Sequence, residues 1–546
     1  MKSYDAGPTD VAIIEDTIGR NLERTVDAVP DAEALVDVTT GARWTWSELN
    51  DEIDVVARGL MALGVERGDR VGMWAPNCPE WTVVQYATAK MGAILVNINP
   101  AYRTHELRYV LNQSGIRTLI SATAFKTSDY VRMVDEVRAE APDLTDVVFL
   151  GTGDWTDLRE RANEVAESQL RERMAALDNR DPINIQYTSG TTGFPKGATL
   201  SHRNILNNGF FTTELINLGR NDRLCIPVPF YHCFGMVMAN LGCSSHGATM
   251  VIPAPSFDPL LTLTAIEKER CTAVYGVPTM FIAMLNHPRF ASADLSSIRT
   301  GVMAGSVCPV EVMKRCVAEM NMTEVAIAYG MTETSPVSCQ TRVDDDLDRR
   351  TATVGRVHPH VEVKIVDPET GDVVERGQPG EFCTRGYSVM LGYWNDDEKT
   401  SADARSKYHR EAIDPDGWMH TGDLAVMRDD GYCNIVGRIK DMVIRGGENI
   451  YPREIEEFLL THPDIEDAQV VGVPDATYGE EVCACLRMKA GRDPLDAEAL
   501  RAFADGKLAH YKIPRYVRIV DEFPMTITGK VRKADLRADC LKFFGL

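Results

Sequence analysis

The stretch Tyr187-Thr188-Ser189-Gly190-Thr191-Thr192-Gly193-Phe194-Pro195-Lys196-Gly197 decides how the rest of the chain is interpreted. Its glycines, hydroxyls and lysine suit a polyphosphate, because glycine lets backbone N–H groups approach phosphate oxygens and an ammonium group neutralises their charge. It is not a Walker loop, since Lys196 follows Pro195 and precedes Gly197. The run therefore predicts a nucleotide-phosphate site of another kind, and an ordinary Gly/Ser/Thr surface loop is the alternative.

Composition limits the partners that the chain can have. Its 546 residues are 44% hydrophobic, enough for two or more domains, and its net charge of -22 argues against nucleic acid and anionic membranes as partners. The thirteen cysteines contain no CxxC pair, which favours a reducing, cytoplasmic compartment, and Cys483 and Cys485 are interpreted as core thiols. The first residues form no apolar signal core, and no run of 18 apolar residues occurs, so we expect no integral membrane segment.

Strand and helix patterns alternate through the first 300 residues. A helix over 49–60, with Ser47 as its cap, precedes the candidate strands and further helices over 81–91 and 106–113. This alternation predicts an α/β fold with doubly wound parallel sheets, in which the strand over 183–187 delivers the glycine loop at its carboxyl end. The candidate strands are 70–74, 93–96, 118–121, 183–187, 223–228, 249–252, 273–276 and 299–303.

Beyond about residue 350 the pattern changes to short alternating runs with turn signals, such as 361–366, which predict small antiparallel sheets. The last hundred residues form a compact mixed α and β unit, which we expect to be a separate domain. The predicted division is therefore an N-terminal domain over 1–438 and a C-terminal domain over 441–546, with a hinge near 439–441.

Two stretches with a single acid complement the loop. In Ala328-Tyr329-Gly330-Met331-Thr332-Glu333-Thr334, the Glu333 carboxylate can hold Mg²⁺ against a phosphate, although taken alone it is a typical helix-starting acid. In Gly417-Trp418-Met419-His420-Thr421-Gly422-Asp423, the Asp423 carboxylate can accept hydrogen bonds from two ribose hydroxyls, although an isolated Gly-Asp is usually a turn.

Two basic stretches follow. Gly437-Arg438-Ile439-Lys440-Asp441, with Arg445-Gly446-Gly447-Glu448-Asn449, has the composition of a solvated linker. Pro524-Met525-Thr526-Ile527-Thr528-Gly529-Lys530 places a lysine just past a glycine turn, which singly would be a surface lysine.

Taken together and in this order, these stretches resemble the adenylate-forming superfamily, and within it the acyl-CoA synthetases. The resemblance covers nearly the whole chain, and medium-chain acyl-CoA synthetases are nearest through 437–456, 470–475 and 479–481. It implies a large N-terminal domain of doubly wound sheets with a small β-barrel-like subdomain, followed by a small mobile α+β C-terminal domain. It also implies ATP, Mg²⁺ and coenzyme A as ligands.

The nucleotide residues follow from this resemblance. The phosphate loop would be Thr188, Ser189, Gly190, Thr191, Thr192, Gly193 and Lys196; the adenine border Ala304, Gly305, Ser306, Tyr329 and Gly330; the α-phosphate and Mg²⁺ ligands Thr332 and Glu333; and the ribose ligands Asp423 and Arg438.

The resemblance also implies the residues that act on the acid and the thiol. Lys530 would reach between the carboxylate and α-phosphate oxygens, and His232 would lie at the gate of the acyl carboxylate, although a lone histidine is more often a packing or capping residue. Lys440 occupies the hinge position, where many family members have Asp. Gly446 and Gly447 would replace Lys530 at the site, leaving room for a pantetheine arm.

Charge at the end of the chain agrees with an anionic ligand. Residues 506–546 carry nine Lys and Arg against four Asp and Glu, in a chain that is otherwise acidic. This reversal suits ATP or coenzyme A, and a basic surface helix is the alternative.

The substrate class rests on residues near His232. No acid occurs within 230–236, which argues against an amino-acid substrate, and the apolar residues include Phe234, Met236, Val237, Met238, Val302, Met303 and Met331. Because thioethers adapt to flexible chains, we expect a medium-to-long aliphatic acid, although these residues could equally be plain core. Three functions remain open: a fatty acid:CoA ligase, an acyl-AMP ligase that loads a carrier protein, and a silent acyl- or nucleotide-binding protein. A homodimer also remains open.

Overall fold

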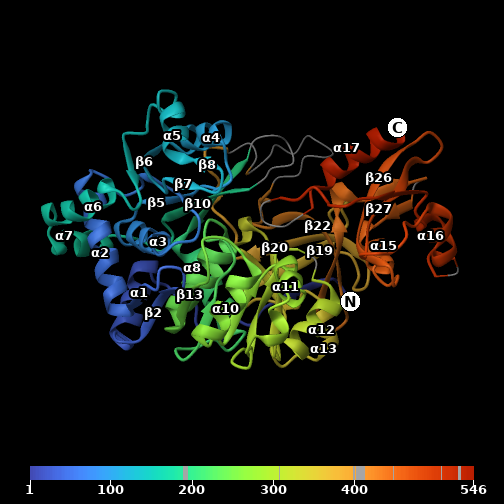
Figure 1. Cartoon of the computed structure of the whole chain (residues 1–546), viewed down its shortest axis with the longest axis horizontal. Helices are drawn as coiled ribbons and strands as arrows, with labels where there is room; N and C mark the ends of the chain where they lie inside the picture. The colour runs from blue at the N-terminus through green and yellow to red at the C-terminus, as the bar shows by residue number, and fades with distance from the viewer. Residues whose placement is uncertain are drawn as a thin grey trace. The chain divides into compact units, whose positions relative to one another are not determined.

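Two large sheets, built mainly of parallel strands, carry the fold in a computed structural model of the chain (Figure 1). The structure describes residues 1–188, 195–306, 308–396, 400, 412–446, 448–505, 507–526 and 531–546, with the backbone only at 448 and 449. None of the helices within these ranges could span a lipid bilayer, each being too short or too polar.

The first sheet has seven strands in the order β21-β11-β10-β5-β4-β6-β9. Its five parallel strands alternate with helices along the chain, as predicted, and β11 and β21 extend it antiparallel. The strands are β4 (Arg70–Trp74), β5 (Ile94–Asn97), β6 (Ile116–Ser121), β9 (Asp146–Phe149), β10 (Pro182–Thr188), β11 (Lys196–Ser201) and β21 (Gly392–Tyr393).

The second sheet has nine strands in the order β18-β17-β16-β15-β14-β12-β13-β2-β3, of which the six from β16 to β2 are parallel. Its strands are β2 (Glu33–Asp37), β3 (Arg43–Thr45), β12 (Arg223–Cys225), β13 (Thr249–Ile252), β14 (Ala273–Gly276), β15 (Thr300–Ala304), β16 (Glu324–Gly330), β17 (Val337–Gln340) and β18 (Arg356–Val357).

Helices connect the strands of both sheets, and their local signals explain where they begin. The predicted cap Ser47 is wrong: the Thr45 hydroxyl accepts the Glu48 N–H at 3.2 Å while Glu48 Oε2 accepts the Thr45 N–H at 2.8 Å, so the cap of α2 lies two residues earlier. The α-helices are α1 (Ile18–Ala28), α2 (Trp46–Ala62), α3 (Pro79–Met91), α4 (Thr104–Ser114), α5 (Tyr130–Arg138), α6 (Gly153–Glu160), α7 (Glu167–Ala175), α8 (His202–Glu214), α9 (Gly242–His246), α10 (Pro259–Glu269), α11 (Pro278–Leu285), α12 (Val310–Glu319) and α13 (Leu347–Ala352).

The later part of the chain forms two smaller sheets. One has the order β1-β19-β20-β22-β23, and in the other β28 joins the β25-β24-β27-β26 order beside β27, with α15, α16 and α17 around it (Figure 1). These elements are β1 (Tyr4–Ala6), β19 (Val361–Val366), β20 (Pro379–Gly386), β22 (Met419–Met427), β23 (Cys433–Arg438), β24 (Val443–Arg445), β25 (Glu448–Ile450), α15 (Pro452–Leu459), β26 (Ile465–Asp475), β27 (Gly479–Met488), α16 (Ala497–Ala504), β28 (Tyr516–Ile519) and α17 (Lys533–Phe544).

Contacts divide the chain into two compact units. The larger unit comprises Asp5–Val363 and Thr384–His420, and the smaller comprises Met1–Tyr4, Lys364–Cys383 and Thr421–Leu546. The chain passes from one unit to the other within β1, β19, β20 and β22. The division at 438 and 441 and the hinge between them stay predictions.

Candidate active site

The glycine loop joins two antiparallel strands of the larger unit. β10 ends at Thr188, β11 begins at Lys196, and these two residues are register partners. The predicted strand before the loop is therefore confirmed, and the first described element after it is the strand β11, whereas a Walker loop leads into a helix. The predictions for Ser189, Gly190, Thr191, Thr192 and Gly193 lie outside the described residues.

Glu333 lies beside the first residue of this hairpin. It belongs to a short 3₁₀ turn, η4 (Thr332–Thr334), which follows β16, and it is buried with 5% of its surface exposed. The Thr188 hydroxyl donates to Glu333 Oε1 at 3.4 Å, although the two residues are 145 positions apart. The structure thus brings together two residues that the sequence analysis assigned to phosphate and Mg²⁺.

Tyr393 completes this group and was missed by the sequence analysis. Its hydroxyl donates to Glu333 Oε1 at 2.9 Å, and the Lys196 Nζ lies 4.9 Å from its ring centroid. Burial, with the adjacent Glu333 carboxylate, raises the pKa of Tyr393 well above its ordinary value, so it stays a neutral donor. No local motif marks this residue, because β21 is only two residues long and is positioned by pairing of Tyr393 with Ala198 of β11.

The Glu333 carboxylate fits the ligand requirement of Mg²⁺. Both hydroxyl donors contact Oε1, which leaves Oε2 for a cation, and Mg²⁺ takes one or two carboxylates together with phosphate oxygens. The Lys196 ammonium, held near the same tyrosine, supplies a second positive charge for a polyphosphate.

The residues assigned to adenine lie at the carboxyl ends of adjacent parallel strands. Ala304 ends β15 and pairs with Ala328 of β16, which continues into Tyr329 and Gly330. Gly305 has a φ of +90°, and a Cβ on Gly330 would lie 1.7 Å from the Pro336 carbonyl oxygen, so both positions require glycine. Open α/β sheets bind ligands at such strand ends. Ser306, the last residue of this predicted border, follows directly and is exposed.

His232 lies in a turn, and the residue after it, Cys233, lies close to η4. The Phe234 N–H donates to His232 Nδ1 at 3.2 Å, so the ring proton of the neutral tautomer is on Nε2. Cys233 Sγ lies 3.9 Å from the Thr332 hydroxyl, which places this turn beside η4. The structure thus brings the turn that contains His232 next to Thr332, and the predicted role of His232 at the acyl carboxylate stays a prediction.

The apolar residues offered as an acyl pocket are mainly core. Phe234, Met236 and Met238 begin the π-helical segment η2 (Phe234–Leu241), and each exposes 4% or less of its surface. The Met236 sulfur accepts the Asn97 amide at 3.1 Å, so this side chain is held inside the fold. The plain-core alternative describes these three residues.

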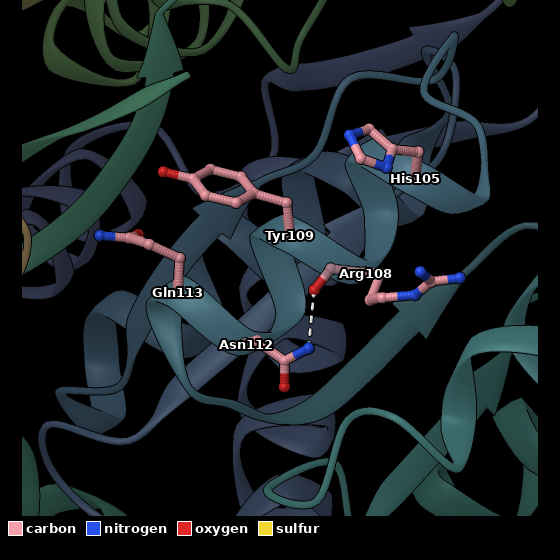
Figure 2. Close-up of a pocket in the computed structure, with 5 residues that line it drawn as sticks. All are labelled: His105, Arg108, Tyr109, Asn112 and Gln113. Carbon is pink, nitrogen blue, oxygen red and sulfur yellow. Dashed lines mark hydrogen bonds between the residues drawn. The ribbon is translucent and has the colours of Figure 1, made fainter. Parts of the chain in front are cut away.

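Helix α4 lies against both ends of the glycine loop. The Tyr109 hydroxyl donates to the Pro195 carbonyl at 3.0 Å, the Tyr187 hydroxyl donates to Gln113 Oε1, and Gln113 Nε2 donates to the Trp394 carbonyl at 2.6 Å. Figure 2 shows Tyr109 and Gln113 projecting from the same side of α4. The helix also lines a surface pocket of about 450 Å³ with the side chains of His105, Arg108, Tyr109, Asn112 and Gln113.

In the smaller unit, the residues assigned to ribose form a pair. Asp423 Oδ1 accepts from Arg438 Nε at 2.9 Å, the two are register partners of β22 and β23, and Asp423 is 7% exposed. Lys440 follows in the short turn η5 (Ile439–Asp441). Burial, and secondarily the Arg438 charge, lowers the pKa of Lys440.

Gly446 directly follows β24, next to a basic pocket of the same unit. It has a φ of +60°, and its N–H donates to the Tyr478 carbonyl at 2.8 Å. Arg445 lies 4.0 Å over the Tyr478 ring and pairs with Glu481 at 2.7 Å. The pocket, about 210 Å³, is lined by Arg445, Tyr478, Glu481, Arg501, His510, Ile513 and Arg515. The predictions for Gly447 and Lys530 lie outside the described residues.

Comparison with known proteins agrees with this geometry. Residues 22–394 match the family described as AMP-binding enzyme, and 454–530 match the AMP-binding enzyme C-terminal domain. The putative acyl-CoA synthetase YngI of Bacillus subtilis is 48% identical over 98% of this chain and 99% of its own. The mitochondrial medium-chain acyl-CoA ligase ACSF2 of Danio rerio is 46% identical over 100% of this chain and 91% of its own. The structure of ATP-bound MatB from Rhodopseudomonas palustris is 30% identical and has a TM-score of 0.84, and the match covers 95% of this chain and 98% of that one.

Proposed function

The chain belongs to the AMP-binding enzyme family and is an AMP-forming acid–thiol ligase, and from this premise we propose that its acid is a medium-to-long-chain fatty acid. The enzyme uses ATP to make acyl-AMP with release of pyrophosphate, and then transfers the acyl group to coenzyme A. The observation that supports the ATP-dependent half of this reaction is the group of Thr188, Lys196, Glu333 and Tyr393 at the base of the glycine loop.

In the proposed first half-reaction, a carboxylate oxygen of the fatty acid attacks the α-phosphorus, and the bond to the pyrophosphate oxygen breaks. Charge builds on the phosphoryl oxygens, so cations that face them lower the barrier. Lys196 and the Mg²⁺ that accompanies ATP would face the leaving pyrophosphate, with Glu333 holding the ion. Lys530 would lie between the carboxylate and the α-phosphate, and His232 Nε2–H would orient the acid.

In the proposed second half-reaction, the thiol of coenzyme A attacks the acyl carbon, the bond to AMP breaks, and the thiol proton leaves to solvent. One site cannot present Lys530 to phosphate and an open path for a thiol at the same time. We therefore propose that the domain over 441–546 turns about Lys440 and exchanges Lys530 for Gly446 and Gly447. The basic pocket lined by Arg445, Arg501 and Arg515 supports a phosphate-bearing thiol substrate.

The chain length of the acid rests on the relatives and not on a cavity. The Danio rerio relative is named a medium-chain ligase, which supports an acid of that class. All thirteen cysteines are free thiols, which supports the cytoplasm as the compartment.

Release of pyrophosphate and AMP with octanoate and laurate, each with and without coenzyme A, tests the proposal. Acid-dependent release of both products together with an acyl-CoA thioester is expected. Acid-dependent pyrophosphate release with no thioester would point to a ligase that loads a carrier protein. Absence of turnover with both acids would contradict the proposed acid class.

A further inference from the structure

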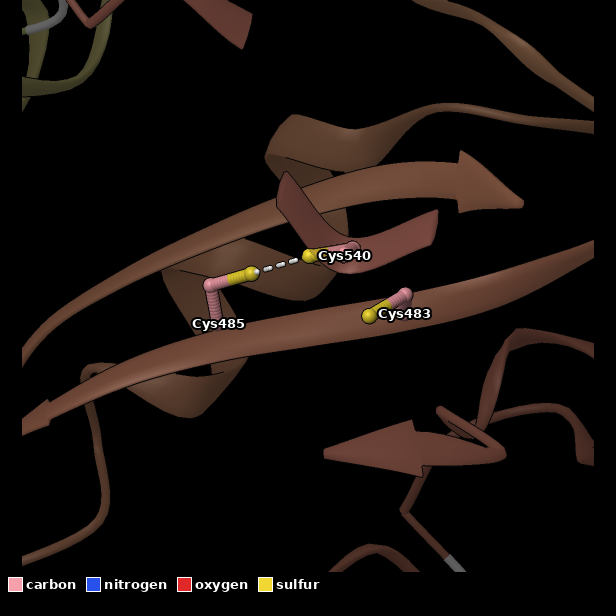
Figure 3. A group of neighbouring side chains, drawn as sticks. All are labelled: Cys483, Cys485 and Cys540. Atoms are coloured by element: carbon pink, nitrogen blue, oxygen red, sulfur yellow. Dashed lines mark hydrogen bonds between the residues drawn. The ribbon is translucent and has the colours of Figure 1, made fainter. Parts of the chain in front are cut away.

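Three buried thiols, to which no role has been assigned above, converge in the smaller unit. Cys483 and Cys485 are two positions apart on β27 and therefore share one face of the sheet, and Cys540 comes from α17. All three are fully buried, and Cys485 Sγ lies 3.2 Å from Cys540 Sγ (Figure 3). Two elements that are 55 positions apart thus place three sulfur atoms together.

The spacing of these sulfurs suits a common metal ion. The three Sγ atoms all lie within 4.8 Å of one another. By geometry, one point then lies within about 2.8 Å of all three, against a zinc–thiolate distance of about 2.3 Å, so small side-chain adjustments would complete the bonds.

The surroundings supply what a thiolate site needs. An apolar shell excludes water from the cluster, with members Val471, Val473, Phe523 and Leu536. Arg518 of β28 is the register partner of Cys485, hydrogen-bonds to Cys540 and acts on it electrostatically, and its guanidinium carbon lies 5.2 Å from the centroid of the Phe543 ring. A guanidinium next to a thiol cluster favours the thiolate form of those cysteines, because opposite charges stabilise each other.

We propose that Cys483, Cys485 and Cys540 bind one thiophilic divalent cation, with Zn²⁺ as the physiological example. Binding releases three thiol protons to solvent and changes no oxidation state. Three thiolates, one divalent cation and the Arg518 guanidinium sum to zero charge, which is the condition for stable burial in an apolar shell. A disulfide would use only two of the three sulfurs and would leave the convergence of Cys483 unexplained.

Such an ion would fasten α17 to β27. Because α17 starts directly after the segment that contains Lys530, the ion would anchor the carboxyl side of that segment. The site does not depend on the proposed ligase activity, and its tests read metal content and stability.

The experiment titrates the reduced full-length chain with Zn²⁺ against a chromophoric chelator. One tightly held equivalent is expected, with a higher thermal midpoint when it is bound. Cys483→Ala and Cys540→Ala should each lose that equivalent. Cys433→Ala, which removes another fully buried thiol of the same unit, should keep it, with circular dichroism reporting that all variants are folded.

Co²⁺ substitution tests the unaltered chain in case the alanine variants do not fold. Intense thiolate-to-cobalt charge-transfer bands are expected at one equivalent, and their absence would overturn the proposal. Loss of Zn²⁺ from Cys433→Ala to the same extent as from Cys540→Ala would also overturn it. A third result would also overturn the proposal: peroxide forms a Cys485–Cys540 disulfide, and the reduced chain retains no metal. That result would make the cluster a redox pair.

Discussion

At the scale of single residues, Glu333 depends on hydroxyl donors that lie 145 and 60 positions away in the chain. Tyr393→Phe removes the closer donor and keeps the ring on which Lys196 lies. A hydrogen bond to a charged group contributes about 1.5–3 kcal/mol, so kcat/KM for ATP should fall roughly tenfold to a hundredfold. Steady-state kinetics at varied ATP measures it. Tyr86→Phe, which removes a core hydroxyl bonded to the Asn240 carbonyl at 2.9 Å, should leave this constant unchanged, and equal losses in both variants would contradict the role of Tyr393.

A second residue-scale prediction concerns His202, the first residue of α8. It is fully buried, its Nδ1 accepts the Ile18 N–H at 3.2 Å, and burial lowers the pKa of His202 from 6.5 to about 4. Because the unfolded chain takes up the proton first, stability that is present above pH 6.5 is lost as the pH falls toward 4.

The linked loss for His202 is about 2 kcal/mol near pH 5. Urea unfolding of the parent and of His202→Asn, near pH 8 and near pH 5, isolates this contribution, because asparagine can accept the Ile18 N–H and does not titrate. The variant should lose about 2 kcal/mol less than the parent on acidification. The same pH dependence in both proteins would show that His202 is not the group responsible.

At the scale of elements, α4 holds both ends of the glycine loop by hydrogen bonds. Gln113 accepts the Tyr187 hydroxyl at one end of the loop, and Tyr109 donates to Pro195 at the other. Gln113→Ala leaves the Tyr187 hydroxyl without this acceptor, which should cost about 1–3 kcal/mol of unfolding free energy. Because the strand end that carries Thr188 would lose its support, KM for ATP should also rise several-fold, measured by initial rates.

Asn112→Ala is the matched control for this element. Its amide donates to the Arg108 carbonyl at 3.0 Å and to the Glu140 carbonyl at 2.9 Å, and neither residue belongs to the loop. Figure 2 shows the bond to Arg108. Asn112→Ala should therefore lower stability without changing KM for ATP. If Gln113→Ala behaved in the same way as Asn112→Ala, α4 would be a structural helix only.

At the scale of the whole molecule, the proposed exchange of faces predicts opposite defects for two variants. Lys530→Ala should slow adenylation by about a hundredfold or more, since it removes a cation from the phosphoryl oxygens, yet it should still convert supplied acyl-AMP and coenzyme A to thioester. Gly447→Leu should adenylate normally and fail at thioester formation. Pyrophosphate release and thioester formation, assayed separately, measure the two halves, and parallel losses in both variants would refute the exchange.

The sequence predicted more of the fold than of the candidate site. Most parallel strands of the two large sheets were predicted within a few residues, because a strand buried on both faces is a continuous apolar run, and β13 and β14 match the predicted 249–252 and 273–276, whereas β2, β9 and β16 were not among the candidate strands. The cap of α2 was misplaced because two hydroxyls two residues apart both precede the apolar pattern, and only backbone geometry selects Thr45. Glu333 was found from its local motif, whereas Tyr393 has none.

The sequence by itself determined the family and the alternation of strands and helices before residue 300, because these depend on residues that are close together in the chain. Only the tertiary structure decided that Tyr393 joins Thr188 and Glu333, that α4 braces the loop, and that Cys483, Cys485 and Cys540 meet around one point. The physical reason is that strand register and helix packing fix which distant side chains touch, and no local pattern encodes those distances.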